Sequence, residues 1–176
     1  MIFHTLEIEG AFLIEPERKE DRRGFFARTY CRNELEERDL DPTVVQCNIS
    51  VNHQRGTVRG MHYQAAPHEE IKLVRCTGGA IHDVILDLRP DSPTFKKHYG
   101  VELSAQNRLS LYIPAGIAHG FQSLEDNSEI FYQMSEFYHP ESARGVRWND
   151  PAFSIQWPLP ISIISDRDLE FPDFEV

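Results

Sequence analysis

Short segments rich in β-branched and aromatic residues follow one another along most of this chain, and they constrain its fold more than any other feature. Turn-forming pairs such as Gly78-Gly79, Pro90-Asp91 and Asp126-Asn127 separate them. Short strands broken at regular intervals by such turns are typical of antiparallel sandwiches and jelly-roll barrels. We therefore expect an all-β chain, with strands over residues 44–50, 57–64, 71–76, 80–88, 100–103, 109–113 and 129–137.

The two ends of the chain are expected to add little regular structure. Residues 11–14 predict a further strand, and residues 18–23 predict a charged turn. Asn33, followed three residues later by Glu36, forms a variant capping box and predicts one short helix over residues 34–39. The proline-rich segment from Pro158 onward is expected to pack irregularly or as a short helical turn. A length of 176 residues without repeats or linkers predicts a single domain.

Charge and cysteine content narrow the possible functions. The formal net charge of −10 argues against a general nucleic-acid-binding protein, because phosphate contacts need a basic surface. Cys31, Cys47 and Cys76 are odd in number and form no CxxC pair, which favours reduced thiols over a disulfide framework. No apolar run approaches the length of a membrane span, and charged residues begin too early for a signal peptide. We expect a soluble, cytoplasmic protein with no membrane or nucleic-acid partner.

The segment GTVRGMHYQ, residues 56–64, carries the most suggestive chemistry. It contains His62, and an unperturbed histidine titrates near neutral pH, at about 6.5. Because strand side chains alternate between faces, His62, Lys72 and Tyr132 each share a face with apolar neighbours. Three such inward faces would bring a base, a cation and a phenol together in the mouth of a barrel. Arg59, three residues from His62, reaches the same side only through a bulge or through a ligand that wraps past the rim.

Taken singly, these side chains have ordinary structural explanations. A lone histidine is typically a hydrogen-bonded structural residue, a strand lysine extends to solvent along apolar neighbours, and a tyrosine fills an amphipathic core position. What favours a site is that His62, Lys72 and Tyr132 occur together on separate inward faces.

A second motif, PAGIAHGF at residues 114–121, resembles the second motif of the cupin superfamily, in which the histidine, here His119, can bind a metal. The first cupin motif supplies HxH followed by glutamate, whereas this chain has only His62 in the corresponding place. His62, His119 and Glu69 or Glu70 could in principle give the three ligands of a catalytic metal. Without the HxH pair, the sequence favours a cupin fold and no metal.

Motifs along nearly the whole chain occur in a recognisable order. Together with Tyr132 they are DRRGFF at 21–26, QCNIS at 46–50, VRGMHYQ at 58–64, KLVRC at 72–76, DVILDLRPDSPTF at 83–95, IPAGIAHGF at 113–121, YHPES at 138–142, WNDP at 148–151 and SDRD at 165–168. In these motifs the chain resembles the dTDP-4-dehydrorhamnose 3,5-epimerase family, metal-free cupins that act on nucleotide-linked 4-keto-6-deoxy sugars. The resemblance therefore implies a cupin-type jelly-roll barrel and no cofactor.

Position by position, the resemblance implies four catalytic residues. His62 corresponds to the general base and Asp168 to its dyad partner. Tyr132 corresponds to the general acid on the other face of the sugar ring, and Lys72 to the cation beside the ketone oxygen. The residues that correspond to binding positions for the nucleotide diphosphate sugar are Arg23, Phe26, Arg28, Gln46, Asn48, Arg59, His119 and Arg167.

The resemblance also implies a homodimer that exchanges an N-terminal arm, residues 1–30, between its chains. The chain departs from the family pattern at a few ligand positions. Arg28 and Ala143 stand where the family usually has glutamates, and Gln133 and Arg167 where lysines are common. Losing two ionised glutamates and gaining an arginine changes the local charge by about +3. We expect this change to relax or alter the preference for the nucleotide base.

The reaction implied is 3,5-epimerisation of dTDP-4-dehydro-6-deoxyglucose to dTDP-4-dehydrorhamnose, in deoxysugar precursor biosynthesis. A C4 ketone acidifies both flanking carbons, so one site with a base, an enolate stabiliser and an acid can invert C3 and C5. Alternatives of the same fold are a single-centre epimerase and a 3,4-ketoisomerase. A metal-dependent cupin oxygenase and a non-catalytic sugar-nucleotide-binding module are the alternatives from other classes. An acid and a base on opposite faces argue against the binding module.

Overall fold

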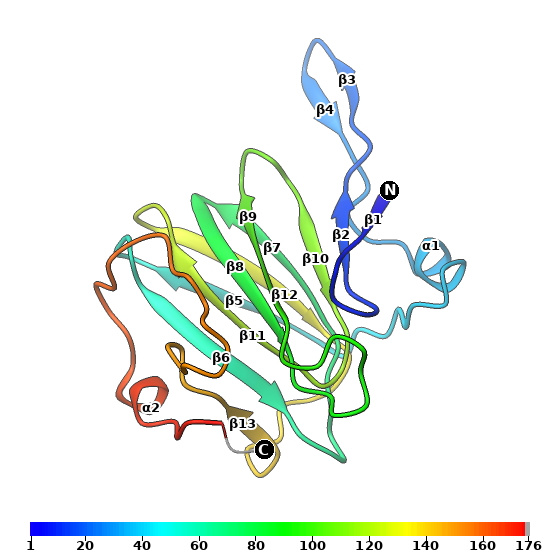
Figure 1. Ribbon diagram of the computed structural model, residues 1–176. Helices are drawn as coiled ribbons and strands as arrows, with labels where there is room; N and C mark the ends of the chain where they lie inside the picture. Colours follow the sequence, from blue (N-terminus) through cyan, green and yellow to red (C-terminus); the bar gives the residue numbers. More distant parts are fainter. Residues whose placement is uncertain (175–176) are drawn as a thin grey trace.

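Two antiparallel sheets packed face to face dominate the computed structural model, which describes residues 1–174 (Figure 1). One sheet has six strands, in the spatial order β1 (Ile2–Thr5), β2 (Phe12–Glu15), β10 (Ser110–Ile113), β7 (Lys72–Gly78), β12 (Ser128–Met134) and β5 (Gln46–Asn52). The other has five, in the order β13 (Ala143–Gly145), β6 (Val58–Gln64), β11 (Ile117–Ser123), β8 (Ala80–Asp87) and β9 (His98–Ser104). The predicted all-β, jelly-roll architecture is confirmed.

Strand β8 shows how the apolar pattern builds two cores. Ile81 and Ile85 point between the sheets, into a cluster that also draws residues from β7, β10, β11 and β12. Val84 and Leu86 point the other way, into a second cluster on the outer face of the five-stranded sheet. Because both faces of β8 are covered by other side chains, residues 80–88 carry apolar side chains on both faces and do not alternate strictly between apolar and polar residues.

The segment that follows β13 covers this outer face. Phe153 and Ile155 pack in the second cluster, and the chain then runs back along the start of β6. The amide of Val58 donates to the carbonyl of Ile163 at 2.8 Å, and helix α2 (Asp166–Leu169) follows immediately. The prediction of an irregular tail with a short helical turn is confirmed, and this tail delivers α2 to the side of β6.

The N-terminal region differs from its prediction. Residues 18–23 are not only a charged turn, because β3 (Lys19–Asp21) and β4 (Gly24–Phe26) pair as a hairpin. Figure 1 shows this hairpin projecting away from the body of the molecule. Each strand is only three residues long, too short to show a period-2 pattern in the sequence.

The predicted helix exists but begins earlier, and the capping-box prediction is wrong. Helix α1 spans Arg32–Glu36, and its N-cap is Cys31, without a side-chain cap. Leu35 is buried in a cluster with Ile14, Leu73 and Tyr112. Packing of this one apolar residue, rather than a polar cap, therefore fixes the helix.

Three further strands, β1, β11 and β13, were not predicted. In β11 the run IAHGFQS contains Gly120, which lowers strand propensity. The structure explains this glycine: a Cβ at Gly120 would lie 2.6 Å from the Sδ of Met61 and 2.9 Å from the carbonyl oxygen of Arg59, both on β6. Two backbones approach here, which only glycine allows. None of the helices within residues 1–174 is long and apolar enough to cross a membrane.

Candidate active site

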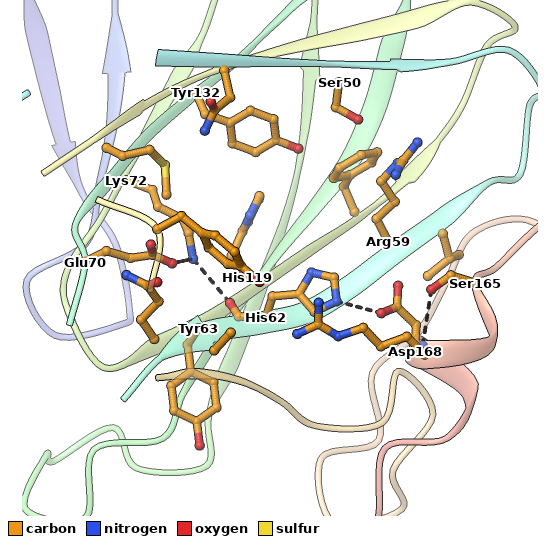
Figure 2. A pocket seen from close by; sticks show the side chains of 18 of the residues that line it. Ser50, Arg59, His62, Tyr63, Glu70, Lys72, His119, Tyr132, Ser165 and Asp168 are labelled. Carbon is orange, nitrogen blue, oxygen red and sulfur yellow. Dashed lines mark hydrogen bonds and ion pairs between the residues drawn. The ribbon is translucent and has the colours of Figure 1, made fainter. Parts of the chain in front are cut away.

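A pocket of about 870 Å³ opens between the two sheets. The six-stranded sheet contributes residues from β5, β7 and β12, and the five-stranded sheet contributes residues from β6 and β11. The segment around α2 forms one side. Figure 2 shows polar side chains from all of these elements converging on this space. A volume of this size suits a ligand of roughly drug or cofactor dimensions, for which sites of ~300–1,000 Å³ are usual.

A histidine and an aspartate form a pair at one side of the pocket. His62 Nε2 lies 2.7 Å from Asp168 Oδ1, although 106 positions separate them in the chain. His62 comes from β6 and Asp168 from α2, so the docking of the tail beside β6 creates the pair. Because an ionised carboxylate only accepts, Nε2 carries the proton and Nδ1 keeps its lone pair. A neutral imidazole in this state can act as a base.

The surroundings of Asp168 keep its carboxylate ionised. Its side chain is only 4% exposed. Burial raises the pKa of Asp168, but the hydrogen bond and charge of His62 and the amide of Gly60 outweigh that effect and hold the pKa below its ordinary value. The hydroxyl of Ser165 caps α2 by accepting from the amide of Asp168. The acceptor of the pair is therefore both charged and fixed in position.

A buried ion pair lies beside His62. Lys72 Nζ is 2.7 Å from Glu70 Oε1, and both side chains are 8% exposed. Lys72 also donates to the main-chain carbonyl of His62 at 3.3 Å, as Figure 2 shows. These two contacts use two of the three ammonium protons and leave one for a ligand.

Tyr132 approaches from the facing sheet. It lies on β12, opposite Asn48 of β5, and its ring stands at 75° to that of His119 with 6.0 Å between centroids. Burial, together with the carboxylate of Asp83, raises the pKa of Tyr132. The phenol therefore stays protonated at neutral pH and can donate a proton. Since His62 and Tyr132 belong to different sheets, they reach the pocket from opposite sides.

His119 is held in the interior by its own carboxylate. Its Nε2 lies 2.9 Å from Asp83 Oδ2, and the two side chains are 5% and 0% exposed. His62, His119 and Glu70 are thus each engaged with a different partner, Asp168, Asp83 and Lys72 respectively. Within residues 1–174 they do not come together as a three-ligand group. This arrangement does not fit a cupin-type metal centre.

A bulge in β6 brings Arg59 to the pocket. His62 pairs with His119 and Arg59 with Phe121, so a step of three residues on β6 faces a step of two on β11. The extra residue cancels the alternation that would have placed Arg59 on the opposite face. Arg59 Nε donates to Asn52 Oδ1 at 2.8 Å, and its side chain lines the pocket. The bulge anticipated from the spacing of these two residues is confirmed.

Comparison with known proteins settles the family. The sequence profile for dTDP-4-dehydrorhamnose 3,5-epimerase matches residues 5–175. The chain belongs to the dTDP-4-dehydrorhamnose 3,5-epimerase family. It is accordingly an epimerase, an isomerase that acts on carbohydrates.

Relatives cover nearly the whole chain. The dTDP-4-dehydrorhamnose 3,5-epimerase of Sinorhizobium fredii is 40% identical over 173 residues, which are 98% of this chain and 89% of the relative. The crystal structure of the enzyme from Elizabethkingia anophelis matches with a TM-score of 0.96 at 40% identity, covering 99% of this chain and 96% of that one. The enzyme from Bacillus anthracis, crystallised with TDP and PPi bound, matches with a TM-score of 0.94 at 40% identity, covering 98% and 99%.

Most of the residues that the resemblance to the epimerase family assigned lie in this pocket. They include all four catalytic candidates and five of the eight binding candidates, namely His62, Lys72, Tyr132, Asp168, Gln46, Asn48, Arg59, His119 and Arg167.

Arg23, Phe26 and Arg28 do not line the pocket of their own chain. Arg23 is 90% exposed and Phe26 is 72% exposed on the projecting hairpin. Arg28 is paired with Glu34 at 2.7 Å. The expected change in pocket charge therefore rests, within one chain, on Ala143 alone, because Ala143 lines the pocket and Arg28 does not.

Ser50 and Glu70 also line the epimerase pocket, although the sequence motifs assigned neither of them to binding or catalysis. Glu70 was expected only as a possible metal ligand. The alternation of side chains along a strand could have placed both residues at the pocket, because Glu70 is two positions from Lys72 and Ser50 is two positions from Asn48. Figure 2 shows Ser50 facing Tyr132 across the upper part of the pocket.

Proposed function

We propose that this protein converts dTDP-4-dehydro-6-deoxyglucose to dTDP-4-dehydrorhamnose by inverting C3 and C5. The observation that carries this proposal is the placement of the His62–Asp168 pair and Tyr132 on opposite sides of one pocket, with Lys72 beside them. Membership of the epimerase family and the TDP bound to the relative from Bacillus anthracis support the reaction and the nucleotide.

The first step is removal of the proton from a carbon next to the C4 ketone. His62 Nδ1 takes this proton while the C–H electron pair moves towards the carbonyl oxygen and forms an enolate. Asp168 then stabilises the imidazolium through its 2.7 Å contact to Nε2. The orienting aspartate of a serine-protease triad has the same role. A positioned base of this kind typically contributes ~10²–10⁴-fold to the rate.

Lys72 stabilises the charge that develops on the C4 oxygen. Its ammonium group has one proton free of Glu70 and of the His62 carbonyl. A donor aimed at a developing oxyanion is commonly worth ~3–4 kcal/mol of transition-state stabilisation. The contact with Glu70 holds the lysine in place for this role.

Reprotonation from the other side inverts the centre. Tyr132 donates its phenolic proton to the enolate carbon on the face opposite to His62, and the enolate electron pair forms the new C–H bond. Solvent later returns a proton to the tyrosinate and accepts the proton held by His62. The same cycle at the second carbon completes the double epimerisation, because both carbons flank the same ketone.

Arginines at the pocket suit a nucleotide diphosphate. Arg59, Arg144 and Arg167 line the pocket of a chain whose net charge is −10. Guanidinium groups bind phosphate oxygens in a two-pronged geometry, so a local cluster can hold a diphosphate despite the overall charge. Gln46 and Asn48 add amides that can bind a base or a sugar hydroxyl.

We also propose that residues 1–176 form one domain that works as a homodimer, with the arm of residues 1–30 reaching the pocket of the partner chain. The projecting hairpin exposes Arg23 and Phe26 to solvent, and neither residue lines the pocket of its own chain. Strand β5 forms one edge of the six-stranded sheet, and its Ile49 is 65% exposed. An exposed sheet edge with apolar residues is well suited to pairing with a second chain.

We also propose a cytoplasmic location, which the chemistry of the cysteines supports. Cys31, Cys47 and Cys76 are free thiols. Burial raises the pKa of Cys76 to about 11, which keeps it unreactive. Free thiols persist in reducing compartments. Thiol titration of the protein isolated from its native cells should find three free thiols, and a disulfide there would contradict this location.

Proton exchange in D₂O tests the reaction. The enzyme is incubated with dTDP-4-keto-6-deoxyglucose, and C3 and C5 are followed by NMR. We expect deuterium at both carbons and formation of the inverted product. Exchange at one carbon alone would replace the proposal with a single-centre epimerase, and absence of exchange at both would exclude this substrate.

A further inference from the structure

Two histidines and a glutamate gather outside the pocket, on the loops that flank it. His68 lies in the loop between β6 and β7, and His139 and Glu141 lie in the loop between β12 and β13. One potential ligand atom from each residue lies within 4.8 Å of the other two. His139 Nδ1 is 3.1 Å from Glu141 Oε1. None of the three lines the epimerase pocket, so the proposed reaction leaves them without a role.

The two histidine rings are stacked on one another. Their centroids are 3.5 Å apart and their planes differ by 5°. The stacking brings imidazole nitrogens from two different loops within reach of one another.

A buried glutamine fixes the two loops beneath this cluster. Gln64 is 3% exposed, and its Nε2 donates to the carbonyls of His68 at 2.9 Å and Phe137 at 3.1 Å. Its Oε1 accepts from the amide of His139 at 2.7 Å. The backbone of both histidines is therefore held before any ion binds, which reduces the entropy cost of binding.

We propose that His68, His139 and Glu141 bind a divalent transition-metal ion of the zinc class. Two imidazoles and one carboxylate, with an open position for water, are a common donor set for zinc. Bonds of about 2.0–2.1 Å place tetrahedral ligand atoms roughly 3.4 Å apart, so the widest separation in the cluster must close by up to about 1.4 Å. Rotation of the histidine rings about χ2, which is a soft torsion, supplies that movement and turns the ring lone pairs towards one point.

The site would join two loops at the rim of the pocket. Glu136 Oε1 lies 3.9 Å from His139 Nε2 and offers a further carboxylate on the same loop. The neighbouring Tyr138 and Gln64 line the pocket. A bound ion would therefore tie the loop after β6 to the loop after β12 without touching the residues that carry out the epimerisation.

Zinc titration of the chelator-treated full-length protein tests this site. Isothermal titration with ZnCl₂ compares the wild type with the double variant His68→Asn/His139→Asn. We expect one equivalent of zinc to bind the wild type with a dissociation constant below about 100 µM, and the double variant to bind that equivalent at least tenfold more weakly, which is about 1.4 kcal/mol. Zinc bound elsewhere, for example at His62, would be common to both proteins and cancel in the comparison.

Two further variants keep the result interpretable. In the matched control His53→Asn/His98→Asn, two exposed histidines outside the cluster are replaced, and zinc binding should not change. Glu141→Gln alters only an exposed side chain, so it tests the site even if the double histidine variant does not fold, and it should also weaken binding. Equal zinc stoichiometry and affinity in the wild type and in Glu141→Gln or the double histidine variant would overturn the proposal, as would the absence of zinc binding to the wild type.

Discussion

His62 obtains its chemistry from a carboxylate 106 positions later in the chain. Three ionisable pairs surround the pocket. Asp168 accepts from His62, Glu70 holds Lys72, and Asp83 holds His119. Tyr132 differs from these groups, because burial keeps it protonated without a charged partner of its own. The proposed roles of base, oxyanion stabiliser and acid rest on these surroundings.

Replacing His62 with alanine should abolish proton exchange at both C3 and C5. The reason is that a single histidine, with its Nδ1 free, serves both carbons. The loss should be at least about 10²–10⁴-fold, while dTDP binding measured by titration calorimetry stays within a few-fold of wild type. His53→Ala is a matched control, since it removes an exposed histidine that does not line the pocket. Near-normal exchange at either carbon in His62→Ala would remove this residue as the shared base.

Replacing Tyr132 with phenylalanine should impair inversion more than proton abstraction. The phenol donates the proton on the far face, so its loss leaves His62 able to remove and return a proton on the near face. Wash-in of deuterium should continue while the epimer product falls by about 10²-fold or more. NMR of one D₂O incubation measures both quantities. Normal product at a normal rate in Tyr132→Phe would place the acid elsewhere.

At the scale of elements, strand β6 and its neighbours position the site through one bulge and one close approach. The bulge turns Arg59 and His62 to the same side, and it forms where Gly60 meets Gly120 of β11. Strand β8 ends in Asp87, whose carboxylate accepts hydrogen bonds from Arg89, Ser92 and Thr94 of the loop that follows.

The substitution Gly60→Ala should destabilise the protein and displace His62. The φ angle of Gly60 is +134°, and a Cβ there would lie 2.5 Å from the Cα of Gly120. Gly24→Ala is a matched control, because Gly24 has a φ of +122° but nothing within 4 Å of an added Cβ. Urea unfolding should show a cost of about 1–3 kcal/mol of backbone strain for Gly24→Ala and a larger one for Gly60→Ala. Equal costs would mean that the contact between β6 and β11 adjusts freely.

The substitution Asp87→Asn should cost stability at neutral pH but not in strong acid. Asp87 is fully buried and accepts from Arg89, Ser92 and Thr94. Burial raises the pKa of this carboxyl, but those hydrogen bonds outweigh it and lower the pKa from 3.8 to about 2. At about 1.36 kcal/mol per pH unit, the difference of about 1.8 corresponds to about 2 kcal/mol.

The direction of this pH dependence follows from the lowered pKa of Asp87. The stabilisation is fully present above the unfolded value of 3.8 and is lost as the pH falls towards about 2. Urea unfolding at pH 7 should therefore show Asp87→Asn about 2 kcal/mol less stable than wild type, and the difference should shrink near pH 2. A difference that does not change with pH would mean that shape, and not charge, accounts for the effect.

For the molecule as a whole, the body carries the proposed catalytic residues, and the projecting hairpin carries Arg23 and Phe26, two of the residues expected to bind ligand. We predict a homodimer in sedimentation experiments at micromolar concentration, and a fully active monomer would contradict it. If the arm serves the partner, His62→Ala and Arg23→Ala should complement each other. After the two inactive variants are mixed and allowed to exchange subunits, half of the dimers are mixed, and each mixed dimer has one intact site. Activity should recover to about a quarter of wild type, and no recovery would place Arg23 at its own chain's site.

The sequence by itself determined the fold class and most of the pocket. Alternating apolar residues and turn signals placed the central strands, because a strand half-buried in a sandwich repeats every two residues. The same periodicity put His62, Lys72 and Tyr132 on inward faces, and the spacing of Arg59 and His62 anticipated the bulge. The ordered family motifs then added Asp168, which no local pattern connects to His62.

Only the tertiary structure decided which distant groups meet. Asp168 reaches His62 because the tail runs along the start of β6, and His68 meets His139 because Gln64 joins two loops. Helix α1 begins where Leu35 finds a core, and not at the polar cap that the sequence offered. Such outcomes depend on contacts between residues far apart in the chain. Local pattern fixes which face a side chain occupies, whereas long-range packing fixes which side chain lies opposite it.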